Sequence, residues 1–225
     1  DVYLIDTTTG EGLYLGLQGS IGTAAVSRNA SVYGFVFLDP LTGLNLPSLS
    51  VVDLANNTTR TFDLRAAHNG LNGNTNSLAT ILQAGSLEFS PDGEMIFYDA
   101  ENEIVLGGSG FTAWSVYALD YTRAEPAFVS IINPIEGLQI GNMSLGNRFL
   151  DRMTFEVAQF QYNAFGQLTD SRSMVYALNL NNGELGQISN ELNTINGLLL
   201  PSFTPDDSAI FFTYPFSPAD PQNSG

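Results

Sequence analysis

Cysteine is absent from the 225-residue sequence, and so is lysine. The lack of cysteine excludes disulfides, thiolate nucleophiles and cysteine-based zinc or iron–sulfur sites. All seven basic residues are arginines, against 23 acidic residues, and the formal net charge is -16. Because such a charge repels phosphate backbones and anionic lipid surfaces, the sequence predicts no nucleic-acid binding.

Histidine occurs once, as His68, and long apolar runs are missing. A Ser-His-Asp hydrolase would need this histidine and a Gly-x-Ser-x-Gly nucleophile turn, which the sequence lacks. The apolar runs are too short to cross a bilayer, so no membrane span is predicted. The chain begins at Asp1 with neither Met nor an apolar leader, as expected of a processed or excised product. An extracytoplasmic location is expected, either secreted, cell-surface or periplasmic.

Short runs of apolar and aromatic residues that end in turn residues are abundant. They occupy residues 2–6, 50–54, 116–120 and 175–179, and each is followed by an Asn-, Thr- or Asp-rich turn. This pattern is typical of half-buried strands that lead into hairpins. The sequence therefore predicts an all-β fold.

A second element alternates with these runs. Residues 87–98 and 202–214 have the pattern of a strand, a Pro-Asp turn and another strand, and weaker copies lie at residues 25–37 and 143–157. The Ser or Thr that opens each turn is predicted at positions 27, 90, 144 and 204. A repeat of roughly 55–60 residues with four short strands is typical of a β-propeller blade.

The Phe-Ser-Pro-Asp-Gly and Phe-Thr-Pro-Asp-Asp turns, at residues 89–93 and 203–207, resemble those of WD40-like (PD40) repeats in TolB-type β-propellers. The resemblance implies a propeller of four-stranded blades, about four of them over residues 1–214, followed by a Pro-rich tail or linker at residues 215–225. The chain starts in phase with a third strand and ends in phase with a second. Either the terminal strands share one blade, or the chain is a stretch of a larger propeller.

One long connection, residues 66–85, interrupts the repeat. Its Asn- and Gly-rich part is a candidate binding loop, with His68, Asn69, Asn72 and Asn74 as the candidate residues. Residues 77–85 are predicted to form a short helix with a Ser cap and a Gly stop.

Acidic residues gather in two places, at Asp99, Glu101 and Glu103 and at Asp206 and Asp207. We interpret both groups as solvated turns whose carboxylates accept local backbone hydrogen bonds. Two carboxylates are also what a glycosidase needs, so carboxylate catalysis stays open. In the alternative interpretation these oxygens are ligands of calcium, although no calcium-binding loop motif occurs. No other cofactor is expected.

The predicted function is that of a non-catalytic accessory or scaffold subunit that binds protein partners within a larger assembly. The alternatives are a carboxylate-based hydrolase of glycans or peptides, or its propeller domain, and a calcium- or small-ligand-binding module. Trp114 and the aromatic residues of the strands are expected to pack between blades. In a eukaryotic protein, glycosylation would be expected at the sequons of Asn29, Asn56, Asn57 and Asn142.

Overall fold

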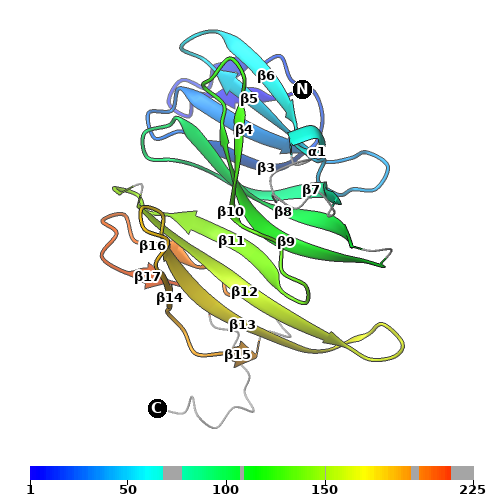
Figure 1. Cartoon of the computed structure of the whole chain (residues 1–225). Helices are drawn as coiled ribbons and strands as arrows, with labels where there is room; N and C mark the ends of the chain where they lie inside the picture. The colour runs from blue at the N-terminus through cyan, green and yellow to red at the C-terminus, as the bar shows by residue number, and fades with distance from the viewer. Residues whose placement is uncertain (68–77, 107–108, 150, 194–197, 214–225) are drawn as a thin grey trace.

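The structure is a computed structural model that describes residues 1–67, 78–106, 109–149, 151–193 and 198–213. Within these ranges every element except the four-residue helix α1 (Leu64–Ala67) is a strand, which confirms the all-β prediction. Three antiparallel sheets follow one another along the chain and stack on one another (Figure 1). No helix in the described ranges has the length and apolarity to cross a membrane.

Each sheet is built from consecutive strands. The first sheet contains β3 (Ile21–Val26), β4 (Val32–Phe37), β5 (Ser48–Asp53) and β6 (Thr58–Asp63). The second contains β7 (Leu78–Phe89), β8 (Met95–Leu106), β9 (Ser109–Asp120) and β10 (Ala127–Ile132). The third contains β11 (Gln139–Leu145), β12 (Arg152–Tyr162), β13 (Leu168–Asn179) and β14 (Leu185–Gln187), with β15 (Leu192–Asn193) paired to β13.

The two ends of the described chain form smaller sheets. β1 (Tyr3–Ile5) pairs with β2 (Gly12–Tyr14), and β16 (Ser202–Phe203) pairs with β17 (Ile210–Phe211). All four predicted hairpins are present. Three of the strands that were predicted to be the third strand of a blade are β5, β9 and β13. Among the strand pairings of the described residues, none joins β17 to β1. Closure of a ring by the terminal strands, and the number of blades, therefore stay predictions.

The short helix predicted at residues 77–85 is wrong. The described part of this segment belongs to β7, which pairs with β8 from Leu78 opposite Val105 to Phe89 opposite Ile96. Local capping signals were outweighed by cross-strand pairing, because β8 continues as a strand through the acidic residues that we expected to form a turn. Gly85 lies in a β-bulge of β7 instead of ending a helix.

The turns of three hairpins share one hydrogen-bond pattern. These turns begin at Ser27, Ser90 and Thr204. In each turn the hydroxyl of this first residue donates to the side chain of the Asn or Asp two residues later. The same hydroxyl accepts from the backbone amide five residues later. This bonding lies within each turn. It explains why these sequences recur at regular intervals.

The remaining hairpin turn begins at Gly146, not at Ser144 as predicted. The Gly146 amide donates to the Arg152 carbonyl at 2.9 Å, in the place that the Ser27 amide takes in its own turn, whereas Ser144 lies within β11. Since Gly146 has no hydroxyl, the turn is held from outside. Asp207 accepts the three turn amides, at 2.5–3.2 Å, of Asn147, Arg148 and Phe149.

Apolar side chains fill the spaces between the sheets. One core, which includes Val36, Leu49, Ile96 and Tyr98, lies between the first and second sheets, and another, which includes Phe97, Met153 and Phe155, lies between the second and third. The packing of strand aromatics between blades is thus confirmed for Tyr117 and Phe155. These two cores fix the sheets against each other.

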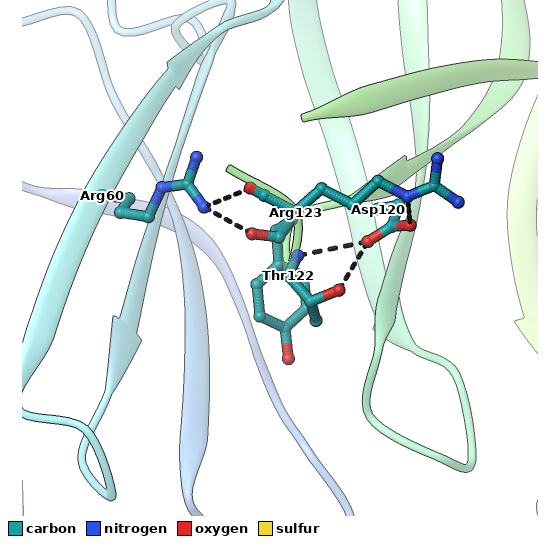
Figure 2. A network of polar contacts seen from close by, with 5 residues as sticks. Arg60, Asp120, Thr122 and Arg123 are labelled. Atoms are coloured by element: carbon teal, nitrogen blue, oxygen red, sulfur yellow. Dashed lines mark hydrogen bonds and ion pairs between the residues drawn. The ribbon is translucent and has the colours of Figure 1, made fainter. Parts of the chain in front are cut away.

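Polar contacts also join the first two sheets. Figure 2 shows the Arg60 guanidinium of β6 reaching the turn between β9 and β10, where it donates to the carbonyls of Tyr121 at 2.7 Å and Arg123 at 3.0 Å. That turn is held locally, because Asp120 accepts from Thr122 and pairs with Arg123 at 2.5 Å. A charged donor on two carbonyls is a strong fixed contact between sheets.

Candidate functional site

A cavity of about 270 Å³ lies between the second and third sheets, where β11 packs against β7, β8 and β9. We call it the inter-sheet cavity. Carboxylates, amides and aromatic rings share its wall, which is formed by Gly85, Ser86, Asp99, Trp114, Gln139, Gly141, Asn142, Glu156, Ala158, Phe160 and Leu198. It is the first candidate for a ligand site because it combines a concave shape with convergent polar groups.

Asp99, on β8, occupies the floor between two β-bulges and is 4% exposed. The bulge in β7 turns the Ser86 amide toward its carboxylate, at 2.6 Å, and the bulge in β11 does the same with the Asn142 amide, at 2.8 Å. The Ser86 hydroxyl donates as well, at 2.6 Å. The bulges interrupt the regular pairing of the strands, so their amides are turned to Asp99. Both carboxylate oxygens therefore accept hydrogen bonds at the bulges.

Two glycines make room for this carboxylate. A Cβ at Gly85 would lie 2.2 Å from Asp99 Oδ1 and 2.7 Å from Trp114 Cζ3, and a Cβ at Gly141 would lie 2.8 Å from Asp99 Oδ2. Burial raises the pKa of Asp99 above its ordinary value, while the hydrogen bonds from Ser86 and Asn142 oppose that rise.

Asn142 connects Asp99 to a second acid, Glu156 of β12. Its backbone has a positive φ of 51°, a conformation that asparagine tolerates better than most residues. Its side-chain amide donates to Glu156 Oε2 at 2.8 Å, and the Leu199 amide donates to the same oxygen at 3.1 Å. Glu156 is 2% exposed, and its other oxygen, Oε1, is buried without a hydrogen-bond partner.

Aromatic and amide groups complete the wall. Trp114, on β9, is half-buried, and its amide donates to Gln139 Oε1 of β11 at 3.0 Å. Phe160 lies further along β12. Trp114, expected only to pack between blades, thus also lines the cavity, where its ring offers an apolar contact surface.

The arrangement favours binding over acid–base chemistry. Hydrolysis by two carboxylates needs one acid to give a proton and the other to attack or to activate water. Both oxygens of Asp99 are occupied by protein donors, so Glu156 is the carboxylate of this cavity with an oxygen left to meet a ligand.

A second cavity, of about 480 Å³, lies where the inner strands β3, β7 and β11 meet their turns. We call it the turn cavity. Glu88 of β7 lines it and accepts from the Leu145 amide of β11 at 2.7 Å. Burial raises the pKa of Glu88 from 4.5 to about 7, against the opposing effect of that hydrogen bond. Glu88 and Arg28 are the two ionisable side chains among the residues that line the turn cavity.

The structure separates the acidic residues that the sequence placed together. Of the first group only Asp99 lines a cavity, since Glu101 accepts from Gln83 at 2.8 Å and Glu103 is exposed on the same strand. The interpretation of this group as a solvated turn is wrong, because β8 runs through it. Of the second pair, Asp206 accepts only within its own turn and Asp207 holds the neighbouring one.

The candidate binding residues His68, Asn69, Asn72 and Asn74 lie outside the described residues, as does the tail at 215–225. The sequon residues Asn29, Asn56 and Asn57 are exposed in turns, whereas Asn142 is partly buried in the inter-sheet cavity. Glycosylation stays a prediction. Glu156 was missed by sequence reasoning, although an acid inside the apolar run at residues 153–158 was a signal that could have identified it.

In the described ranges, no three His, Cys, Asp or Glu side chains come together in a way that could hold a metal ion. Calcium binding stays a prediction.

Neither a family model nor a curated protein matches this chain. Among solved structures, the chain is similar to an oligogalacturonate lyase in complex with manganese, with a TM-score of 0.52 and 18% identity over 93% of this chain and 49% of that one. The fold is that of a β-propeller. The chain spans about half the length of this neighbour.

Two further structures are more distant. The β-propeller domain of the Trilobed protease from Pyrococcus furiosus has a TM-score of 0.37 and 8% identity over 93% of this chain and 67% of that one. The periplasmic gluconolactonase of Pseudomonas aeruginosa has a TM-score of 0.35 and 9% identity over 93% of this chain and 83% of that one. At such identities the likeness concerns the fold and leaves function to the site.

Proposed function

We propose that this chain is a ligand-binding propeller segment that holds a small, hydroxyl-bearing molecule of the size of one sugar unit in the inter-sheet cavity. The observation that carries the proposal is Glu156 Oε1, a buried carboxylate oxygen without a partner in the wall of a cavity. An unsatisfied buried acceptor of this kind costs about 1–3 kcal/mol, and more when it is charged. A donor brought by a ligand would remove that cost.

The size and lining of the cavity support this ligand class. Its volume of about 270 Å³ lies just below the roughly 300–1,000 Å³ typical of ligand pockets, which favours a single ring over a peptide or a long chain. Trp114 and Phe160 provide apolar surfaces for the C–H faces of a sugar ring. Gln139 and Asn142 add amide groups for its hydroxyls. Oε1 itself is covered, so binding requires a small displacement of the side chains around it.

Enzymatic turnover of a glycan is the second candidate. The fold fits it as well as it fits binding, since structural neighbours include enzymes. The free oxygen of Glu156 is the feature that favours it. The occupied oxygens of Asp99 count against it, because a two-carboxylate mechanism would need them. The scaffold role and the extracytoplasmic location predicted from the sequence stay predictions.

Titration calorimetry with glucose and galactose tests the proposal, together with the Trp114→Ala variant. Binding that weakens at least about tenfold in the variant is expected, because a half-buried aromatic wall would be removed. The control is Glu103→Gln, a change at an exposed position of β8 outside the cavity lining. Heat signals that are absent, or equal in Trp114→Ala and wild type, would refute the proposal. Hydrolysis of aryl glycosides that is lost in Glu156→Gln would instead establish the enzymatic candidate.

A further inference from the structure

We propose that the group that meets Glu156 is a protonated amine, so that the inter-sheet cavity selects an amino sugar over neutral and acidic sugars. This inference rests on the proposed function and specifies its ligand. It follows from a charge imbalance in the cavity wall.

Two buried carboxylates lie in one wall, and neither has a counter-ion. Asp99 and Glu156 are 4% and 2% exposed and are joined through Asn142. The ion pairs found in the described part of the chain involve Asp120, Asp151, Asp170 and Glu191, and none reaches either carboxylate. A buried charge is normally paired, because its removal from water is costly.

The rest of the wall contains no basic side chain to offset these acids. The chain has no lysine, and none of its seven arginines lines the cavity. Arg60, for example, is bound to carbonyls between the first two sheets (Figure 2). A cationic ligand would supply the missing positive charge, whereas a uronic acid would add a further negative charge to a wall that already holds two acids.

The partners already bound to the carboxylates favour an ammonium over a metal ion. Both oxygens of Asp99 face hydrogen-bond donors, so few of their lone pairs remain for a metal that needs six to eight oxygen ligands. An ammonium has three N–H donors, one of which Glu156 Oε1 can accept, and the cation also gains from an aromatic face nearby. Trp114 offers that face in the same wall.

The experiment compares three sugars of one shape and different charge. Glucosamine, glucose and glucuronate are titrated into the full chain by calorimetry, at low salt and at a pH where the amine is protonated. We expect glucosamine to bind at least about tenfold more tightly than glucose, equivalent to about 1.4 kcal/mol, and glucuronate to bind more weakly than glucose. This comparison uses the wild-type protein and does not depend on a variant that folds.

Two matched variants distinguish an effect of the charge in the cavity from an effect of the overall charge of the protein. Glu156→Gln removes the charge but keeps an oxygen for Asn142 and Leu199, so glucosamine should lose more affinity than glucose and the preference between them should disappear. Glu103→Gln removes the same charge from an exposed position of β8 outside the cavity lining, so the preference should persist.

Four outcomes would overturn the inference, and they differ in what else they affect. Equal affinity for glucosamine and glucose would refute the amine preference and leave the proposed sugar site intact. A preference that is lost in both Glu156→Gln and Glu103→Gln would have the same two consequences. Competitive displacement of glucosamine by calcium chloride would point to a metal site. If no sugar binds at all, the proposed function fails with the inference.

Discussion

Glu88 gives the sharpest test of the electrostatics of this fold. It lines the turn cavity, and one of its oxygens accepts from the Leu145 amide of the next sheet. Burial raises its pKa to about 7. The perturbation is Glu88→Gln, which keeps an oxygen for the amide and removes the titrating group.

The magnitude follows from the difference between the two pKa values. Because the pKa of Glu88 is higher in the folded chain than its ordinary value of 4.5, the folded state holds a proton that the unfolded state has released. Between these two pH values, stability therefore falls as the pH rises. A rise from 4.5 to about 7 corresponds to about 3 kcal/mol, all of it present below the lower value and lost once the pH exceeds the upper one.

Urea denaturation of wild type and Glu88→Gln, followed by the fluorescence of the single tryptophan, measures this effect at roughly pH 5 and roughly pH 8. The variant should gain up to about 3 kcal/mol relative to wild type as the pH rises between them. The difference between the two proteins cancels the titration of the other acidic side chains. Parallel stability curves would show that Glu88 is not desolvated in the fold, and Glu103→Gln provides the control for loss of a charge.

Three further substitutions test the contacts between and within the sheets. Asp99→Ala should lower the free energy of unfolding by about 2–6 kcal/mol, since two partly buried bulge amides lose their acceptor, and urea denaturation at neutral pH measures it. Gly85→Ala should cost about 1–3 kcal/mol and weaken sugar binding, because its Cβ collides with Asp99; unchanged stability and affinity would contradict the described bulge. Arg60→Ala should cost about 1–3 kcal/mol through loss of its carbonyl contacts, whereas the exposed Arg65→Ala should change little in the same measurement.

The strands could be predicted from the sequence because each apolar run carries its own turn residues. The turns at Ser27, Ser90 and Thr204 are stabilised by bonds among neighbours in the chain, so local sequence was sufficient to locate them. Where a turn is held from outside, the local pattern was misleading. The third turn was placed at Ser144, although it begins at Gly146 and depends on Asp207.

The inter-sheet cavity could not be predicted in this way. Its polar groups meet only because two β-bulges and a left-handed asparagine bring β7, β8, β11 and β12 into register. Capping signals at residues 77–85 suggested a helix, since nothing local indicates that β8 pairs along its full length with this segment. An acid in a buried strand, such as Glu156, was a local sign of a site, as was the candidate carboxylate Asp99.

The carboxylates that join the sheets accept from backbone amides, although Asp99 also accepts from the Ser86 hydroxyl. Glu88 does so with β11, Asp99 with both bulges, and Asp207 with the Gly146 turn. Every residue except proline supplies an amide, so these contacts constrain the acid that accepts, whereas the side chain of the donating residue takes no part in the bond. Mutational drift in such a repeat should therefore be asymmetric: these bonds restrict the acids, while their partners are restricted only by the other contacts that their side chains make.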